Sequence, residues 1–156
     1  MNLAQQVIDA ARAADLKIAT AESCTGGMVA AALTDISGAS AVFDRGFITY
    51  SYASKPEMLG INPDTIEAHG AVSAEVVAQM ASGALAHSDA DIVVAITGIA
   101  GPVKGSAKPE GRVWFAISTT TSITTIVQEF GAIGRAKVRR ASVEQALALL
   151  LGAIKR

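Results

Sequence analysis

The sequence has little charge, few aromatic residues and a single cysteine, and each shortage excludes a class of protein. Charged residues make up 17% of the 156 residues and aromatic residues 4%. The net charge of −1 argues against a nucleic-acid-binding surface as the main function. One cysteine, Cys24, cannot form an internal disulfide framework, and a lone thiol is typical of a reducing compartment. We therefore expect a cytoplasmic protein without nucleic-acid partners.

The chain also lacks a long apolar run, a basic leader and a cluster of metal ligands. The densest apolar run, residues 147–151, is far shorter than the about 20 residues that a membrane span needs. The N-terminus has no basic segment followed by an apolar core, so we expect neither secretion nor membrane association. The two histidines, His69 and His87, lie too far from Cys24 or any acidic cluster to predict a metal site.

The sequence is rich in apolar residues. Hydrophobic residues make up 51% of the sequence, and no repeat or low-complexity linker divides it, so we expect one domain over residues 1–156. Spacing and composition predict helices near 3–14, 28–37, 54–59, 73–87 and 143–154, strands at 17–20, 41–50, 91–97, 112–118 and 123–130, and a turn at 62–64. The last two strands form an antiparallel hairpin, and Gly46 suggests a bulge. Helices alternating with buried strands predict a three-layer α/β/α domain with a mixed sheet.

Two glycine-containing turns follow predicted strands, and ligands of such sheets bind outside the carboxyl ends of strands. In the first turn Ser23 is a candidate nucleophile, and neighbouring backbone amides could hold an oxyanion. The simpler alternative is that Ser23 or Thr25 only caps a helix. Cys24 is a rival nucleophile. The alternative interpretation of Cys24 is a small buried apolar residue.

A serine nucleophile in this chain needs a base other than histidine, because neither histidine has the context of a catalytic triad. Lys55 is the best substitute, provided that burial lowers its pKa from about 10.4. A solvent-exposed surface lysine is the alternative interpretation of Lys55. After the second glycine turn, Lys104, Lys108 and Arg112 could bind a phosphate, although solvated loop charges explain them equally well.

Four motifs, in one order along nearly the whole chain, resemble the CinA C-terminal domain family (competence/damage-inducible protein). Enzymatic members of that family are nicotinamide mononucleotide deamidases. The motifs are Ala21-Glu22-Ser23-Cys24-Thr25-Gly26-Gly27, Tyr50-x4-Lys55 with Leu59-Gly60-Ile61, His69-Gly70-Ala71-Val72-Ser73, and Thr97-Gly98-Ile99-Ala100-Gly101-Pro102.

The resemblance implies a five-stranded, mixed and mostly parallel sheet, and hydrolysis of the carboxamide of a pyridine mononucleotide without a cofactor or metal. It implies that Ser23 is the nucleophile and Lys55 its base, with Tyr50 beside them. It also implies a stand-alone form of the domain and leaves a homo-oligomer open. The residues that it assigns to substrate binding are Thr25, Gly26, Gly27, Thr97, Gly98, Gly101 and Arg135, and we expect residues 98–112 to hold the phosphate.

Three departures from the family pattern surround this dyad. Tyr52 stands where the deamidases usually have asparagine, residues 103–107 form a loop one residue short, and Arg135 lacks the acid that usually precedes it. Two functions therefore have to be weighed. One is an amidohydrolase, and the other is a catalytically weak or silent member that binds a nucleotide or a protein partner.

Overall fold

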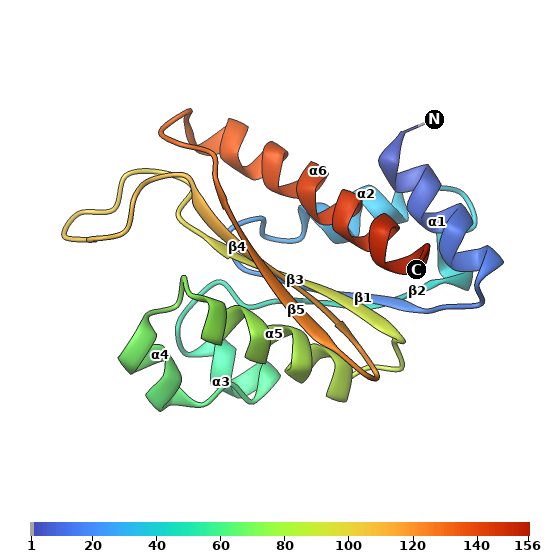
Figure 1. The fold of residues 1–156 in the computed structure, drawn as a ribbon, viewed down its shortest axis with the longest axis horizontal. Coiled ribbons are helices and arrows are strands. Elements are labelled where there is room, and N and C mark those ends of the chain that lie inside the picture. Colours follow the sequence, from blue (N-terminus) through green and yellow to red (C-terminus); the bar gives the residue numbers. More distant parts are fainter. Residues whose placement is uncertain (1) are drawn as a thin grey trace.

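A computed structural model describes residues 2–156 and contains a five-stranded sheet between two helical layers (Figure 1). The strand order is β2-β1-β3-β4-β5. β1 pairs in parallel with β2 and β3, whereas β4 is antiparallel to β3 and β5, so four of the five strands run in one direction. This is the mixed, mostly parallel sheet with one hairpin that the sequence predicts. The strands are β1 Ile18–Glu22, β2 Phe43–Ile48, β3 Ile92–Gly98, β4 Arg112–Thr119 and β5 Ile123–Glu129.

Helices lie on both sides of the sheet, as Figure 1 shows, and α3 and α4 pack against α5. On one face lie α1 Leu3–Ala13, α2 Met28–Thr34 and α6 Arg135–Ile154, and on the other lie α3 Ser54–Leu59, α4 Pro63–His69 and α5 Ala74–Ala86. A short 3-10 helix, η1 (Ala39–Ala41), precedes β2. Within residues 2–156 no helix combines the length and the hydropathy that crossing a membrane requires.

The alternation of side chains along the strands divides the core into two clusters. In β3, Val94 and Ile96 pack toward α1, α2 and α6, whereas Val93 and Ala95 pack toward α5. The α5 face is built largely from alanine, which lets that helix lie close to the sheet. Gly83 of α5 extends this close packing to α3, because a Cβ at Gly83 would lie 2.1 Å from the carbonyl oxygen of Leu59.

One helix was missed by the sequence analysis, which predicted only a turn at residues 62–64. The Oδ1 atom of Asn62 accepts a hydrogen bond from the N–H of Asp64 at 2.9 Å, and Pro63 occupies the first helical position. Both are signals of a helix start as well as of a turn. The residues that follow continue as α4 to His69.

Other boundaries also differ from the prediction. β1 continues to Glu22, β2 is shorter than residues 41–50, and α6 begins at Arg135 rather than near residue 143. The bulge lies at Asp44, which the pairing with β1 skips, and not at Gly46. Gly46 instead allows a close approach, because a Cβ there would lie 2.7 Å from the Oγ1 atom of Thr20.

Candidate active site

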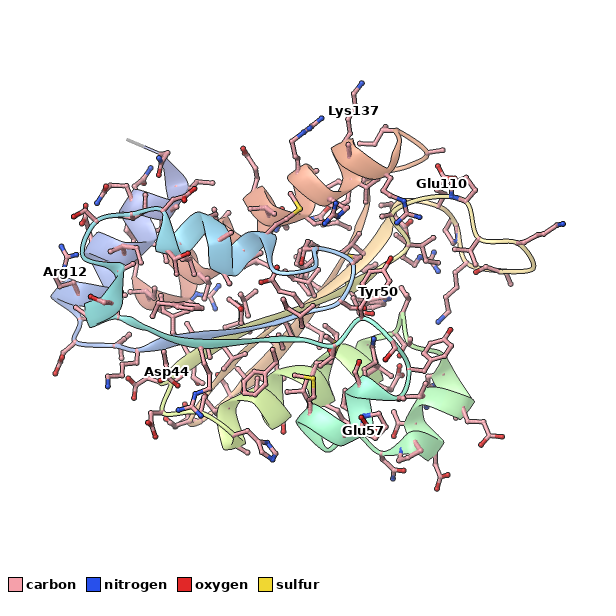
Figure 2. All side chains as sticks on the ribbon, turned by 180° about the vertical axis from the view of Figure 1, so that it is seen from behind. Arg12, Asp44, Tyr50, Glu57, Glu110 and Lys137 are labelled. Atoms are coloured by element: carbon pink, nitrogen blue, oxygen red, sulfur yellow. The ribbon has the colours of Figure 1, made fainter. Side chains whose placement is uncertain are left out.

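A cavity of about 550 Å³ opens at the carboxyl ends of β1 and β3, beneath the loop that joins β3 to β4. Tyr50 marks this end of the molecule in Figure 2, and Asp44 lies toward the opposite end. The residues that line the cavity are Ser23, Cys24, Tyr50, Ser51, Tyr52, Lys55, Gly70, Ala71, Val72, Thr97, Gly98, Ile99, Ala100, Gly101, Val103, Ser106, Ala107, Lys108 and Arg135.

Ser23 is the first residue after β1, and the sheet holds its backbone in place. Its N–H donates to the carbonyl of Ile96 at 3.0 Å, and its own carbonyl accepts from the N–H of Gly26 at 3.1 Å. Its side chain borders the cavity, and the Oγ atom lies 3.1 Å from the Nζ atom of Lys55. The fold therefore brings together two side chains that are 32 residues apart in the sequence.

Lys55 is a buried lysine, not the surface residue that was its alternative interpretation. Its exposed fraction is 1%, and its Nζ atom lies 2.6 Å from the carbonyl of Thr49 and 3.5 Å from that of Tyr50. No acidic side chain within residues 2–156 pairs with it, and burial lowers its pKa. The Nζ atom donates to these two carbonyls and to the hydroxyl of Ser23. A lowered pKa makes the loss of the Lys55 proton easier than for an exposed lysine.

Cys24 lies beside this pair, but its thiol is poorly suited to attack. Its exposed fraction is 6%, and burial raises its pKa to about 12. Because the thiolate is the reactive form of cysteine, the thiol remains protonated and weakly nucleophilic at neutral pH. The interpretation of Cys24 as a small buried apolar residue agrees with this environment.

Glu22 is a site residue that the sequence analysis missed. Its buried carboxylate accepts hydrogen bonds from the Thr25 hydroxyl at 2.7 Å and from the backbone N–H groups of Val29 at 2.9 Å and Ala30 at 3.1 Å. These N–H groups belong to the first turn of α2. Glu22 therefore occupies them, and they are not available to a ligand. The signal in the sequence that could have indicated this role is an acidic residue directly before Ser23.

The predicted substrate-binding residues divide into two groups. Thr97, Gly98, Gly101 and Arg135 line the cavity, as does Tyr50. Thr25, Gly26 and Gly27 are not among the lining residues. The hydroxyl of Thr25 is fully buried against Glu22, and the two glycines have no side chain, so the substrate contacts predicted for these three residues fall to their backbone groups and stay a prediction.

The predicted phosphate-binding cations are mostly engaged elsewhere. The Nζ atom of Lys108 donates to the carbonyls of His69 and Val72, and burial, followed by the charge of Arg112, lowers its pKa. Arg112 bonds Glu129 at 2.6 Å, and Lys104 does not border the cavity. Arg135 does border it and has no hydrogen-bond or ion-pair partner among residues 2–156.

Arg135 reaches the cavity wall because Gly101 has no side chain, since a Cβ there would lie 3.1 Å from an Nη atom of Arg135. No group of three or more histidine, cysteine or acidic side chains that could hold a metal ion occurs in the part of the chain that the structure describes. The chemistry available at the site is therefore that of a hydroxyl, a buried amine, backbone amides and one unpaired guanidinium.

Fold and site together define a class: a three-layer α/β protein that holds a buried serine–lysine pair over an open cavity at its sheet edge. The model of one family, the CinA C-terminal domain, matches residues 1–154. The chain belongs to this family.

Relatives with sequence and structural similarity agree with that assignment. The chain is 48% identical over 151 residues to the nicotinamide-nucleotide amidohydrolase PncC of Escherichia coli strain K12, covering 96% of this chain and 92% of that protein. A CinA-like protein of Akkermansia muciniphila is 46% identical over 140 residues, which is 89% of this chain but 34% of the relative. The crystal structure of the competence/damage inducible protein CihA from Agrobacterium tumefaciens superposes with a TM-score of 0.94 at 46% identity, covering 99% and 94% of the two chains.

Proposed function

We propose that the protein hydrolyses the carboxamide of nicotinamide mononucleotide, giving nicotinic acid mononucleotide and ammonia. The observation that carries the proposal is the 3.1 Å separation of the Ser23 Oγ and Lys55 Nζ atoms, with the lysine buried and without an acidic partner among the described residues. The substrate is inferred from relatives named as nicotinamide-nucleotide amidohydrolases.

In the first half of the reaction Lys55 takes the proton of the Ser23 hydroxyl as the oxygen attacks the amide carbon. The carbonyl oxygen becomes an oxyanion. The backbone N–H group of Thr25 is the candidate donor to it, because it has no acceptor among residues 2–156 and lies two residues after the nucleophile. Lys55 then protonates the nitrogen, the carbon–nitrogen bond breaks, and ammonia leaves an acyl-enzyme on Ser23.

In the second half a water molecule gives a proton to Lys55 and attacks the acyl carbon. The bond to the Ser23 oxygen breaks, that oxygen recovers its proton from Lys55, and nicotinic acid mononucleotide is released. The same two side chains serve both halves, so no metal or cofactor is required by the chemistry.

Substrate binding would combine charge with aromatic surface. Arg135 is an unpaired cation on the cavity wall and suits the phosphate of the substrate. The side chains of Tyr50 and Tyr52 border the cavity and are 63% and 69% exposed, so their rings are free to contact the cationic pyridinium ring.

The departures from the family pattern leave the dyad intact, and we therefore favour the enzyme over a silent binding protein. The backbone carbonyl of Tyr52 accepts a hydrogen bond from the N–H of Lys55 at 3.3 Å. The side chain of Tyr52 is exposed at the opening of the cavity. A change at the mouth is expected to alter substrate affinity more than the chemical step.

The test is release of ammonia from nicotinamide mononucleotide by the purified protein, with nicotinamide riboside and nicotinamide as comparison substrates. The riboside lacks the phosphate and should show a KM roughly ten- to a hundredfold higher, the scale of one or two charge-assisted hydrogen bonds. Ser23→Ala provides the blank. Ammonia release that does not exceed this blank would refute the proposed function.

A further inference from the structure

The turn that carries Ser23 is held from outside by a side chain 115 residues away. Arg139 of α6 donates from Nε to the carbonyl of Cys24 at 3.0 Å and from an Nη atom to the carbonyl of Thr25 at 3.3 Å. Its side chain is half-buried and has no acidic partner among the described residues. A guanidinium that bonds only to two peptide carbonyls fixes their orientation.

The orientation of those carbonyls determines where the neighbouring N–H groups point. All peptide bonds described here are trans, so the N–H of Thr25 points away from the carbonyl of Cys24 in the same peptide plane. Arg139 holds that carbonyl toward α6, and the N–H of Thr25 is thereby directed away from α6. This N–H group has no acceptor within residues 2–156.

Gly26 provides a second, independent indication. Its φ of +58° lies in the left-handed region, which favours glycine. A Cβ at this position would also touch an Nη atom of Arg139 at 3.4 Å. Any longer side chain would compete with the guanidinium for this space, so the sequence of the turn leaves room for Arg139.

We propose that Arg139 is a positioning residue for the chemical step at Ser23. Its two hydrogen bonds keep the peptide planes of the turn in the orientation that presents the backbone N–H group of Thr25 to the oxyanion. This inference rests on the proposed function, because it takes Ser23 as the nucleophile. It assigns a role to a residue that does not line the cavity and does not touch the substrate.

The kinetic test compares Arg139→Gln and Arg139→Ala with a matched control, Arg140→Gln. Arg140 is the next residue of α6, is exposed, and makes no hydrogen bond or ion pair within residues 2–156. Both Arg139 variants should lose about ten- to a hundredfold in kcat with KM nearly unchanged, the scale of a small misplacement of catalytic groups. Arg140→Gln should match the wild type.

Chemical rescue separates positioning from a merely structural role. Guanidinium chloride at millimolar concentration should restore kcat of Arg139→Ala several-fold, because the free cation can bind the two vacated carbonyls. It should do nothing for the wild type or for Arg140→Gln. A loss of kcat that comes with a lower melting temperature and is not rescued would overturn the proposal, as would an unchanged kcat in Arg139→Gln.

A reagent that is not a nucleotide keeps this inference distinct from the proposed function. A fluorophosphonate phosphonylates an activated serine and places its oxygen where the oxyanion would lie. If the wild type is labelled at Ser23 but releases no ammonia from nicotinamide mononucleotide, the proposed substrate is wrong and the labelling rate still tests Arg139. Slower labelling of Arg139→Gln than of Arg140→Gln supports the positioning role, whereas equal rates overturn it. A wild type that is neither labelled nor active overturns both proposals.

Discussion

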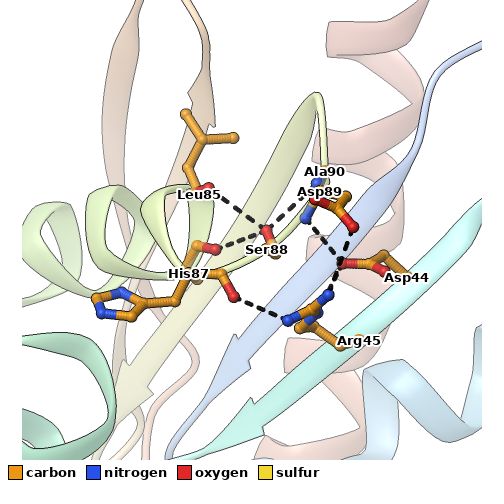
Figure 3. Close-up of polar contacts among 8 residues, drawn as sticks. Asp44, Arg45, Leu85, His87, Ser88, Asp89 and Ala90 are labelled. Carbon is orange, nitrogen blue, oxygen red and sulfur yellow. Dashed lines mark hydrogen bonds and ion pairs between the residues drawn. The ribbon is translucent and has the colours of Figure 1, made fainter.

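The two ends of the strands carry charged side chains in opposite arrangements. At the amino end, Figure 3 shows Asp44 accepting from the Nε atom of Arg45 at 2.8 Å and from the N–H of Asp89 at 3.0 Å. Arg45 also donates to the carbonyl of His87 at 3.1 Å. At the carboxyl end, Lys55 has no acidic partner in the described part of the chain. Charges that neutralise each other stabilise the fold, whereas an isolated buried amine is left free for chemistry.

The pKa values of the two ends express the same difference. Burial by itself would raise the pKa of Asp44, but hydrogen bonds from Asp89 and Arg45 and the charge of Arg45 outweigh it, and the pKa is lowered. Burial also lowers the pKa of Lys55, and there it outweighs the smaller opposing effect of Cys24. The surroundings at the amino end thus stabilise the charged form of the carboxylate, whereas burial at the carboxyl end destabilises the charged form of the amine.

The largest expected effect is at the nucleophile. Ser23→Ala should reduce kcat for nicotinamide mononucleotide by at least about 10⁴-fold, the scale seen when a nucleophile is removed. Circular dichroism and the melting temperature should stay close to the wild type, because only one oxygen atom is lost. Cys24→Ala is the matched comparison and should keep most of the activity. The reverse ranking of the two variants would assign the chemistry to the thiol.

Removal of the base should have the next largest effect. Lys55→Met should lower kcat by about 10³-fold, within the range of general acid–base catalysis. The wild-type rate should rise with pH as Lys55 loses its proton, with a midpoint below the ordinary lysine value of 10.5. This limb should be missing from the residual activity of Lys55→Met. Only a few-fold loss, or an unchanged pH profile, would contradict the dyad.

The same substitution should also change how the stability of the protein depends on pH. The folded protein binds the Lys55 proton less tightly than the unfolded chain, so the free energy of unfolding rises with pH between the lowered pKa and 10.5. The free energy of unfolding of Lys55→Met relative to the wild type should therefore fall as pH rises toward 10.5. Urea unfolding at a series of pH values measures the difference. A difference independent of pH would show that Lys55 is charged in the folded state.

The smallest effect is expected at the amino end. Asp44→Ala should cost about 1–2 kcal/mol of unfolding free energy, since two hydrogen bonds are lost, and should leave kcat within about twofold. Asp44→Asn should fall between Asp44→Ala and the wild type, because one acceptor remains. As the pKa of Asp44 is lowered, its contribution persists above the ordinary value of 3.8 and is lost as pH falls through the folded pKa. A large loss of activity in either variant would break the contrast between the two ends.

Local patterns in the sequence predicted most of the fold. The hairpin was expected at residues 112–118 and 123–130 and is observed as β4 and β5 at nearly those bounds, because the short link between two apolar runs leaves few alternatives. The start of α6 was missed because its first turns, from Arg135 to Arg140, are basic and show little apolar periodicity. Helix α4 was missed because asparagine followed by proline signals a turn and a helix start alike.

The site was predictable only where its contacts are local or repeated in a motif. Ser23 and Lys55 stand beside recognisable turns, and the structure brings them together. The contacts of Glu22 and Arg139 depend on packing between α2, α6 and the end of β1. Arg139 in particular reaches across 115 residues, and no spacing rule connects positions so far apart.

The close contact between α5 and α3 bears on whether proteins descended from this one keep its activity. Gly83 carries no functional group and lies on a different helix from Lys55, yet its missing side chain sets how near α3 can lie. One added methyl group would meet the carbonyl of Leu59 and push against the helix that carries the lysine. A descendant of this protein could thus retain Ser23, Lys55 and every cavity-lining residue and still lose its activity through Gly83. Inspection of the cavity alone would class such a descendant as an enzyme.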